Sequence, residues 1–198
     1  MIYLARHAQS AWQVVREDVN DTLTQMGHEQ AARLARWLAE HERVDRGGRI
    51  RIARLLVSPL RRARETATYV SEAVGLQADM QDSLAEADFH VSDHLPVVNS
   101  PFEPHGAYEP SDAYDRFKQQ ARSALEELVK HSDAAGGPIL AVTHGGLIKT
   151  LLRLIAGSDA MSFDVYNTGI TALDWKRGRW HLVHLNLCDH LPPPLRTL

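Results

Sequence analysis

The sequence contains a single cysteine, Cys188, in 198 residues. One cysteine cannot form a disulfide within the chain, so nothing in the sequence indicates an oxidising compartment. No segment approaches the roughly 18 consecutive apolar residues of a membrane-spanning helix, because Lys149 and Arg153 interrupt the apolar stretch 147–155. The chain enters the short apolar stretch Ile2–Ala5 without the basic leader of a signal peptide. We therefore expect a cytoplasmic protein that does not bind membranes.

The sequence also lacks the basic patches of a nucleic-acid-binding protein. Its formal net charge is -3, and no run of lysine and arginine long enough to form a basic face appears beyond the short cluster Arg61, Arg62 and Arg64. It has no P-loop, no HExxH motif and no paired-cysteine zinc pattern. We expect neither a nucleic-acid partner nor a metal or other cofactor.

The composition is that of an ordinary globular protein. Hydrophobic residues make up 44% of the chain and charged residues 24%. The length suits one domain over residues 1–198, and there are no internal repeats or low-complexity tracts. Residues 88–112 differ from the rest, with little periodicity and many prolines and histidines; we interpret them as a cap or loop insertion. These residues are Pro96, Pro101, Pro104 and Pro110, and His90, His94 and His105.

Three short apolar stretches, each followed by a polar cluster and a helical pattern, predict buried strands. They are Ile2–Ala5, Ile52–Val57 and Pro138–Val142. Helices are predicted from Thr24 to about Glu40, directly after Ser58-Pro59, from Ser111, and after Gly146. This β-to-α alternation predicts an α/β fold with a mostly parallel sheet covered on both faces.

The C-terminal part of the sequence has a different pattern. Ile170–Trp175 and Trp180–Leu185 flank a short basic turn that contains Gly178, which predicts a β-hairpin. The last residues, with Pro192–Pro194, are expected to be a loose tail.

Polar residues follow each of the three predicted strands. Ligands of parallel sheets bind beyond the carboxyl ends of the strands, so these residues should meet in one crevice. Helix N-termini at the same edge add backbone N–H groups and positive dipole ends. The site is thus expected to bind an oxyanion with two histidines and two arginines. The residues at the three ends are Arg6 and His7, then Ser58 to Arg62, then Thr143 and His144.

These residue types suit phosphoryl transfer. A neutral imidazole is a competent nucleophile near pH 7, because its unperturbed pKa is about 6.5. Arginine stays charged and presents a planar fork to phosphate oxygens. Arg6, Arg62 and one histidine could therefore hold the phosphoryl group while the other histidine attacks phosphorus.

The motifs resemble those of the histidine phosphatase superfamily, the phosphoglycerate-mutase-like proteins. The segment from Arg6 to Ser10, with Trp12, is similar to the Arg-His-Gly signature of that family. The matches keep the family's order over roughly residues 2–185. The others are Asp21, Leu23, Thr24, Gly27, Gln30 and Ala31; Ser58, Leu60, Arg62, Ala63, Thr66 and Ala67; Leu84 and Glu86; Thr143 to Gly146; and Asn167, Ile170 and Thr171.

The resemblance implies a role for each matching residue. His7 would be the nucleophile, and Glu86 would act first as general acid and then as general base. Arg6, Arg62 and His144 would bind the phosphoryl oxygens. Gln13 stands where an asparagine often reaches the phosphate, and Gly145 belongs to the last phosphate-binding block. The family fold, a three-layer α/β/α sandwich, agrees with the strand and helix pattern.

The sequence also departs from the family pattern. Ala8 replaces the usual glycine, which is tolerable where φ is negative, and Gln9 replaces a common glutamate. Ala87 to His90 occupies the place of the usual Gly-x-Trp-Glu-Gly pattern. The substrate of a relative therefore does not transfer directly. Asp82 and Asp88 are alternative acids near Glu86, and His90 and His94 are candidate substrate contacts or, less favoured, metal ligands.

The sequence thus favours a metal-independent phosphomonoesterase of the histidine acid phosphatase type that forms a covalent phosphohistidine on His7. Its substrate would be a small-molecule phosphate ester or a phosphoprotein. A mutase would use the same residues, but the chain is short for one. A catalytically inactive phospholigand-binding module is the third possibility, and the intact set of acid and nucleophile argues against it.

Overall fold

The computed structural model describes residues 1–15, 21–40, 44–45, 48–49, 52–97, 100 and 108–198. Its central sheet has the strand order β5-β4-β6-β1-β7-β8. The first four strands in this order run parallel to one another, whereas β7 is antiparallel to β1 and forms a hairpin with β8. The strands are β1 (Ile2–Arg6), β4 (Arg54–Val57), β5 (Ala78–Met80), β6 (Ile139–Thr143), β7 (Ile170–Lys176) and β8 (Arg179–Leu187).

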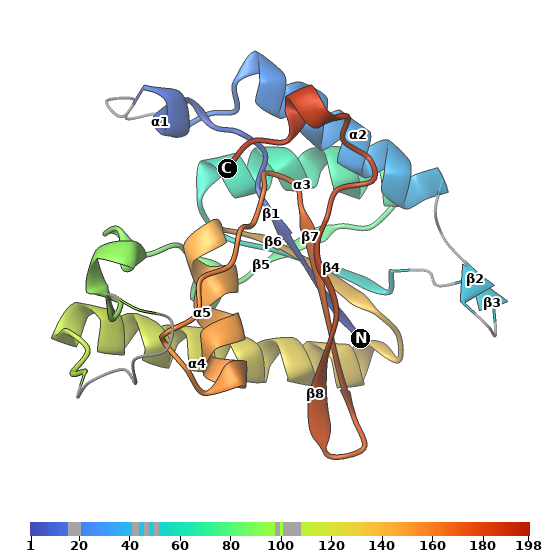
Figure 1. Cartoon of the computed structure of the whole chain (residues 1–198). Helices are drawn as coiled ribbons and strands as arrows, with labels where there is room; N and C mark the ends of the chain where they lie inside the picture. The colour runs from blue at the N-terminus through green and yellow to red at the C-terminus, as the bar shows by residue number, and fades with distance from the viewer. Residues whose placement is uncertain (16–20, 41–43, 46–47, 50–51, 98–99, 101–107) are drawn as a thin grey trace.

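Helices cover both faces of this sheet (Figure 1). Helices α2 and α3 lie on one face, and α4 and α5 lie on the other. This arrangement confirms the predicted three-layer α/β/α sandwich with a mostly parallel sheet. The helices are α1 (Ala11–Val14), α2 (Gln25–Glu40), α3 (Arg61–Val74), α4 (Asp112–Ala135) and α5 (Gly145–Ala156), with short 3₁₀ turns η1 (Asp82–Leu84), η2 (Val91–His94) and η3 (Pro193–Leu195).

Strand β6 shows why the buried strands are continuously apolar in sequence. Ile139 and Ala141 pack toward α4 and α5, whereas Leu140 and Val142 pack toward α2 and α3. Successive side chains of a strand point to opposite faces, and here both faces are buried. The strand therefore anchors two core layers at once.

Two of the predicted helix starts, at Thr24 and Ser111, are confirmed by capping contacts. The backbone N–H of Gly27 donates to Thr24 Oγ1 at 3.0 Å, and the N–H of Tyr114 donates to Ser111 Oγ at 3.3 Å. Each contact satisfies an N–H group that the first turn of a helix leaves without a backbone acceptor. The side chains of these two residues thus fix where α2 and α4 begin.

The expectation of a loose C-terminal tail is wrong. Leu191 and Leu195 are buried against Met26 of α2. The side-chain amide of Gln30, which is fully buried in the same helix, donates to the carbonyl oxygen of Leu195 at 2.8 Å. Proline has no backbone N–H group, so a proline-rich segment can satisfy few of its own carbonyl oxygens. Here the side chain of Gln30 in α2 donates the hydrogen bond that the carbonyl of Leu195 needs.

Two further elements differ from the prediction. Strand β5 was not predicted, because it has three residues with Asp79 at its centre. The connection after α2 contains a short antiparallel pair that was not predicted either, β2 (Val44–Asp45) with β3 (Gly48–Arg49). Within 88–112 the described residues include η2, whereas Pro101, Pro104 and His105 lie outside the described residues. No helix in the described part of the chain is long and apolar enough to cross a membrane.

His190, in the C-terminal segment, should make the fold sensitive to acid. Burial lowers the pKa of this imidazole to about 4, although Asp189 opposes the shift. The unfolded chain, with an unperturbed pKa near 6.5, then binds more protons than the folded one between pH 6.5 and pH 4. This contribution to stability is present above pH 6.5 and is lost as pH falls through that window, by up to about 3 kcal/mol.

We expect His190→Gln to lose less stability than the wild type between pH 7 and pH 4.5, in urea unfolding followed by circular dichroism. His184→Gln, at an exposed position of β8, is the matched control and should follow the wild type. An unchanged pH dependence in His190→Gln would show that His190 is not the group responsible.

Candidate active site

The two predicted histidines are neighbours because their strands are paired in register. Arg6, the last residue of β1, is paired with Thr143, the last residue of β6. His7 directly follows Arg6, and His144 directly follows Thr143. The N–H of His7 extends the ladder by donating to the carbonyl oxygen of Thr143 at 2.8 Å. The two imidazole centroids are 5.1 Å apart. The sheet therefore brings together residues that are far apart in sequence.

His7 is held in one tautomer. Its Nδ1 lies 2.7 Å from the carbonyl oxygen of Ala8, which can only accept, so Nδ1 carries the proton. The lone pair is then on Nε2, which accepts from Arg62 Nε at 3.1 Å. Burial, and after it the charges of His144 and the two site arginines, hold the pKa of His7 well below 6.5. The φ angle of Ala8 is not positive, so its methyl group causes no strain there.

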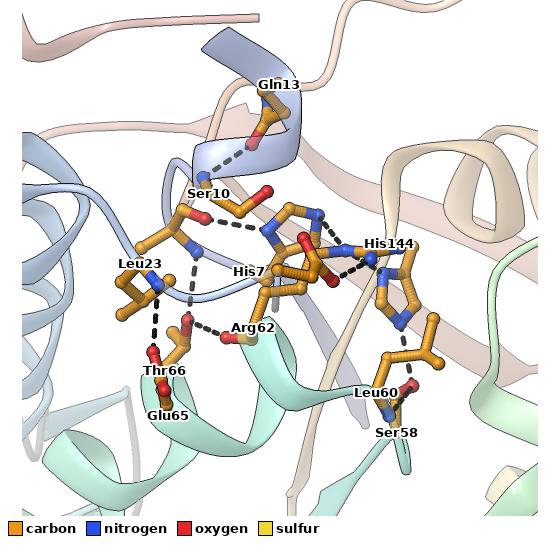
Figure 2. A network of polar contacts seen from close by, with 12 residues as sticks. His7, Ser10, Gln13, Leu23, Ser58, Leu60, Arg62, Glu65, Thr66 and His144 are labelled. Atoms are coloured by element: carbon orange, nitrogen blue, oxygen red, sulfur yellow. Dashed lines mark hydrogen bonds and ion pairs between the residues drawn. The ribbon is translucent and has the colours of Figure 1, made fainter. Parts of the chain in front are cut away.

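Arg62 lies at the centre of the site, between the two histidines (Figure 2). Its Nε also points at His144 Nδ1, at 3.2 Å, so one N–H group is shared by two acceptors. Its Nη1 forms an ion pair with Asp21. Asp21 also lines the pocket, a position that the sequence analysis did not predict for it. Asp21 belongs to a stretch that resembles the family, but nothing in the sequence spacing linked it to Arg62.

His144 is oriented by the segment that leads into α3. Its Nδ1 accepts from Arg62, so its Nε2 carries the proton and donates to Ser58 Oγ at 2.7 Å. Ser58 in turn accepts from the N–H of Leu60 at 3.3 Å. Burial, with the charges of Arg62 and Arg6, lowers the pKa of His144 well below 6.5. A dianionic phosphoryl group beside it would favour its protonated form.

Arg6 is a half-buried cation at the same edge of the sheet. Its Nη1 donates to the carbonyl oxygen of Val165 at 2.6 Å, whereas its buried Nε has no partner among the described residues. Burial lowers its pKa to about 10, so it remains charged at neutral pH. Gly145 lies against this guanidinium, and a Cβ at Gly145 would lie 3.3 Å from Arg6 Nε. An unpartnered buried N–H of this kind is suited to an anion.

Glu86 lies at the N-terminus of α5. Its Oε2 accepts from the N–H of Gly146 at 2.8 Å, and its Oε1 accepts from the N–H of Ala87 at 3.2 Å. Gly146 must be glycine for this approach, because a Cβ there would collide with the carboxylate. Burial raises the pKa of Glu86, although the two N–H contacts and the nearby arginines oppose the shift. A carboxyl group with a raised pKa is suited to donate a proton near neutral pH.

Gln13 is at the wall of the site, but its amide is engaged. It exchanges hydrogen bonds with Asn167, at 3.1 and 3.2 Å, and its Oε1 accepts from the N–H of Ser10 at 3.0 Å. Asn167 also donates to the carbonyl oxygen of His7 at 2.9 Å. Asn167 therefore supports the loop of His7, a role that the sequence did not indicate.

Most of the predicted site residues line a pocket of about 840 Å³. They are Arg6, His7, Gln13, Arg62, Glu86 and Gly145, whereas His144 lies behind Arg62 and is not part of the lining; the segment after Glu86 forms one wall of the pocket. His90 lies on this wall, with its ring centroid 6.2 Å from that of Trp12. The lining residues are Arg6, His7, Trp12, Gln13, Asp21, Leu60, Arg62, Glu86, Ala87, Asp88, Phe89, His90, Val91, Ser92, Leu95, Gly145, Gly146, Lys149, Arg153, Ser162 and Leu198.

The alternative residues are not all brought to the pocket. Asp88 lines it, but Asp82 does not. His94 does not line it either, and its Nδ1 lies 2.6 Å from Ser111 Oγ. Over the residues that the structure describes, no group of three or more histidine, cysteine, aspartate or glutamate side chains is arranged to hold a metal ion.

Comparison with known proteins agrees with this geometry. Residues 2–188 match the model of the histidine phosphatase superfamily (branch 1). The chain is 27% identical to the "Putative phosphoserine phosphatase 2" of Hydrogenobacter thermophilus, covering 96% of each chain. It is 23% identical to the "Probable phosphoglycerate mutase GpmB" of Klebsiella pneumoniae, covering 90% of this chain and 86% of that one.

A solved structure shows the same fold. The phosphoserine phosphatase of Entamoeba histolytica, in complex with 3-phosphoglyceric acid, superposes with a TM-score of 0.71 at 21% identity, over 96% of this chain and 98% of that chain. The family match spans nearly the whole chain, from the first strand to the C-terminal segment. The chain therefore belongs to branch 1 of the histidine phosphatase superfamily, a family of phosphatases.

Proposed function

We propose that this protein hydrolyses phosphate monoesters through a covalent phosphohistidine on His7. The observation that carries the proposal is the state of that imidazole. It is buried, its pKa is held well below 6.5, its Nδ1 proton is held by the carbonyl of Ala8, and its Nε2 lone pair points at Arg62, with Arg6 lining the same pocket. A nucleophile needs an unprotonated nitrogen, and a phosphoryl group needs cations beside it.

The first step transfers the phosphoryl group to His7. Arg6, Arg62 and His144 hold the non-bridging oxygens, and His7 Nε2 attacks phosphorus in line with the leaving oxygen. The N–P bond forms as the ester P–O bond breaks, and the leaving oxygen takes the proton of Glu86. The preorganised positive groups stabilise the charge on the transferring group without rearrangement of water.

The second step returns the enzyme to its starting state. Glu86, now a carboxylate, removes a proton from a water molecule that attacks phosphorus on the side opposite His7. The new O–P bond forms, the N–P bond breaks, and inorganic phosphate leaves. Glu86 is protonated again, and the raised pKa that burial gives it supports both roles.

A small phosphorylated metabolite is the substrate class that the pocket favours. Its volume of about 840 Å³ suits a molecule of that size, and Phe89, His90 and Trp12 bound it. The named relatives act on, or are bound to, phosphoserine and 3-phosphoglyceric acid. A phosphoprotein would have to reach His7 past this wall, so we favour the small ester.

A mutase is the second candidate, because one relative carries that name and the same residues would serve. A mutase returns the phosphoryl group to a second hydroxyl of its substrate, whereas a hydrolase transfers it to water. The two differ in product. A phosphatase releases one equivalent of inorganic phosphate per substrate consumed, and a mutase accumulates an isomer.

We expect the purified protein to release inorganic phosphate from p-nitrophenyl phosphate and to do so at the same rate in EDTA. The physical reason is that Arg6, Arg62 and His144 already place positive groups on the phosphoryl oxygens. Phosphate release with and without EDTA, and after addition of zinc or magnesium, checks this expectation. A rate that falls in EDTA and returns with metal would contradict metal independence and bring His90 back as a candidate ligand.

A further inference from the structure

Helix α5 carries two charged side chains, Lys149 and Arg153, and both line the active-site pocket. They are four residues apart, so they lie on one face of the helix. Apart from Thr150, the rest of α5 carries no polar side chain, and Leu147, Ile148 and Leu151 are buried in the core. Two cations on a largely apolar helix thus face the cavity in which the proposed reaction occurs.

Arg153 is buried and forms no ion pair with the described residues. It is 3% exposed, its Nε donates to the carbonyl oxygen of Met161 at 2.8 Å, and its buried Nη1 has no partner among the described residues. The nearby carboxylate of Asp159 accepts from Tyr114 Oη at 2.8 Å and pairs with Lys118 at 3.3 Å. No ion pair joins Asp159 to Arg153 within the described chain. A buried guanidinium with a free N–H group is costly unless an anion completes it.

Lys149 occupies the position between Arg153 and the catalytic acid. It is half-buried and forms no hydrogen bond or ion pair with the described residues. Its pKa is lowered by burial and by the charge of Arg6, while Asp164 and Glu86 partly oppose this. Asp164 is exposed, and Glu86 is engaged with the N–H of Gly146. Lys149 therefore adds a second cation that lacks a dedicated partner.

The spacing along α5 sets how far these cations lie from the reaction. Glu86, which protonates the leaving oxygen in the proposed mechanism, contacts α5 at Gly146. With a rise of about 1.5 Å per residue, Lys149 is about 4.5 Å and Arg153 about 10 Å further along the axis. Side chains of a helix lean toward its N-terminus, which brings both cations back toward Glu86. An anion a few bonds beyond the leaving oxygen would meet them.

We propose that Lys149 and Arg153 bind a second anionic group of the substrate, a carboxylate or another phosphate, on the leaving-group side of the ester. This inference rests on the proposed phosphatase activity and names its substrate class. The phosphoryl group occupies Arg6, Arg62 and His144, and the distal anion occupies the two cations of α5. Phosphate monoesters without a distal charge then react by the same chemistry but bind more weakly.

The test uses phosphate monoesters of ω-hydroxy carboxylic acids with two to six carbons, each compared with the phosphate of the corresponding methyl ester. At the best chain length, the wild type should prefer the carboxylate by about 10- to 100-fold in kcat/KM, as expected for one charge-assisted contact. Lys149→Met should remove most of this preference through KM, with kcat nearly unchanged. Activity on p-nitrophenyl phosphate should change by less than about threefold.

Matched variants separate binding from folding. Lys149→Arg keeps the charge and should keep the preference, and Lys130→Met, on α4 outside the pocket lining, should behave as the wild type. Arg153→Met is compared with Arg153→Lys, and thermal unfolding shows whether either is folded. The bisphosphate of the diol of best length tests whether the distal group is a phosphate rather than a carboxylate.

A binding measurement distinguishes failure of this inference from failure of the proposed function. The His7→Ala protein cannot turn the esters over, so calorimetric titration gives their Kd directly. A carboxylate that binds more tightly than its methyl ester, with the difference lost in Lys149→Met, supports the subsite even if no ester is hydrolysed. Equal Kd values and equal kcat/KM for the charged and neutral members of every pair would overturn it.

Discussion

Replacing His7 with alanine should lower the rate of phosphate release by about 10⁴-fold or more, because no other group in the pocket can form the covalent intermediate. His144, the other histidine of the site, has its Nε2 proton held by Ser58 and its Nδ1 facing Arg62, so it is not placed to attack in its stead. Steady-state release from p-nitrophenyl phosphate measures the loss. His28→Ala, at an exposed position of α2, is the matched control.

The chemical nature of the intermediate is checked by the same pair of proteins. A substrate labelled in its phosphoryl group, mixed with the wild type and quenched, should leave label that is labile in acid and stable in base, as phosphohistidine is. His7→Ala should carry none. Label that resists acid, or that maps to a serine or an aspartate, would rule out His7 as the nucleophile.

Glu86→Gln should slow the phosphorylation step of alkyl phosphates by about 10²- to 10⁴-fold and that of aryl phosphates far less. Glutamine keeps the shape of the side chain but has no transferable proton. An alkoxide needs that proton in order to leave, whereas a nitrophenolate scarcely does. Since burial raises the pKa of Glu86, the wild type should lose activity on alkyl phosphates as pH rises through that pKa. This alkaline limb should be absent from Glu86→Gln.

Controls distinguish the acid from the cations and from its acidic neighbours. Arg62→Ala should slow both classes of substrate alike, because both share the phosphoryl oxygens. Single-turnover rates are compared, since Glu86 also serves the hydrolysis step. Were Asp88→Asn to show the leaving-group dependence while Glu86→Gln slowed both classes equally, the proton donor would be Asp88. Asp82→Asn should have no effect, as Asp82 lies outside the pocket lining.

The buried strands, and the histidines that follow them, could be predicted because a run of neighbouring apolar residues marks each strand in the sequence. Ile2–Arg6 and Ile139–Thr143 are continuous apolar stretches, and a strand covered on both faces has that pattern. Parallel pairing then places the residues after both strands at one edge of the sheet. The prediction of an oxyanion site followed from this edge and needed no knowledge of individual contacts.

The contacts that orient the site residues could not be predicted, since they join side chains that are distant in sequence. Asp21 reaches Arg62 across 41 residues, and Asn167 reaches the carbonyl of His7 across 160. No periodicity relates these positions. The same reason explains the error at the C-terminus, where the buried amide of Gln30 binds a segment whose own composition is typical of a loose chain.

Because β1 and β6 lie in the middle of the sheet, substitutions at the ends of these strands should differ in effect from substitutions in the pocket lining. The reacting residues follow strands that are hydrogen-bonded on both sides, so displacing them would disturb the core of the whole sheet. Part of the pocket lining comes instead from a short connecting segment, including the exposed His90, and from one face of α5. We expect exchanges of an exposed lining residue such as His90 to cost less stability than exchanges at the strand ends. Under the proposed function, such exchanges would change which ester binds while the groups that hold the phosphoryl oxygens stay in place.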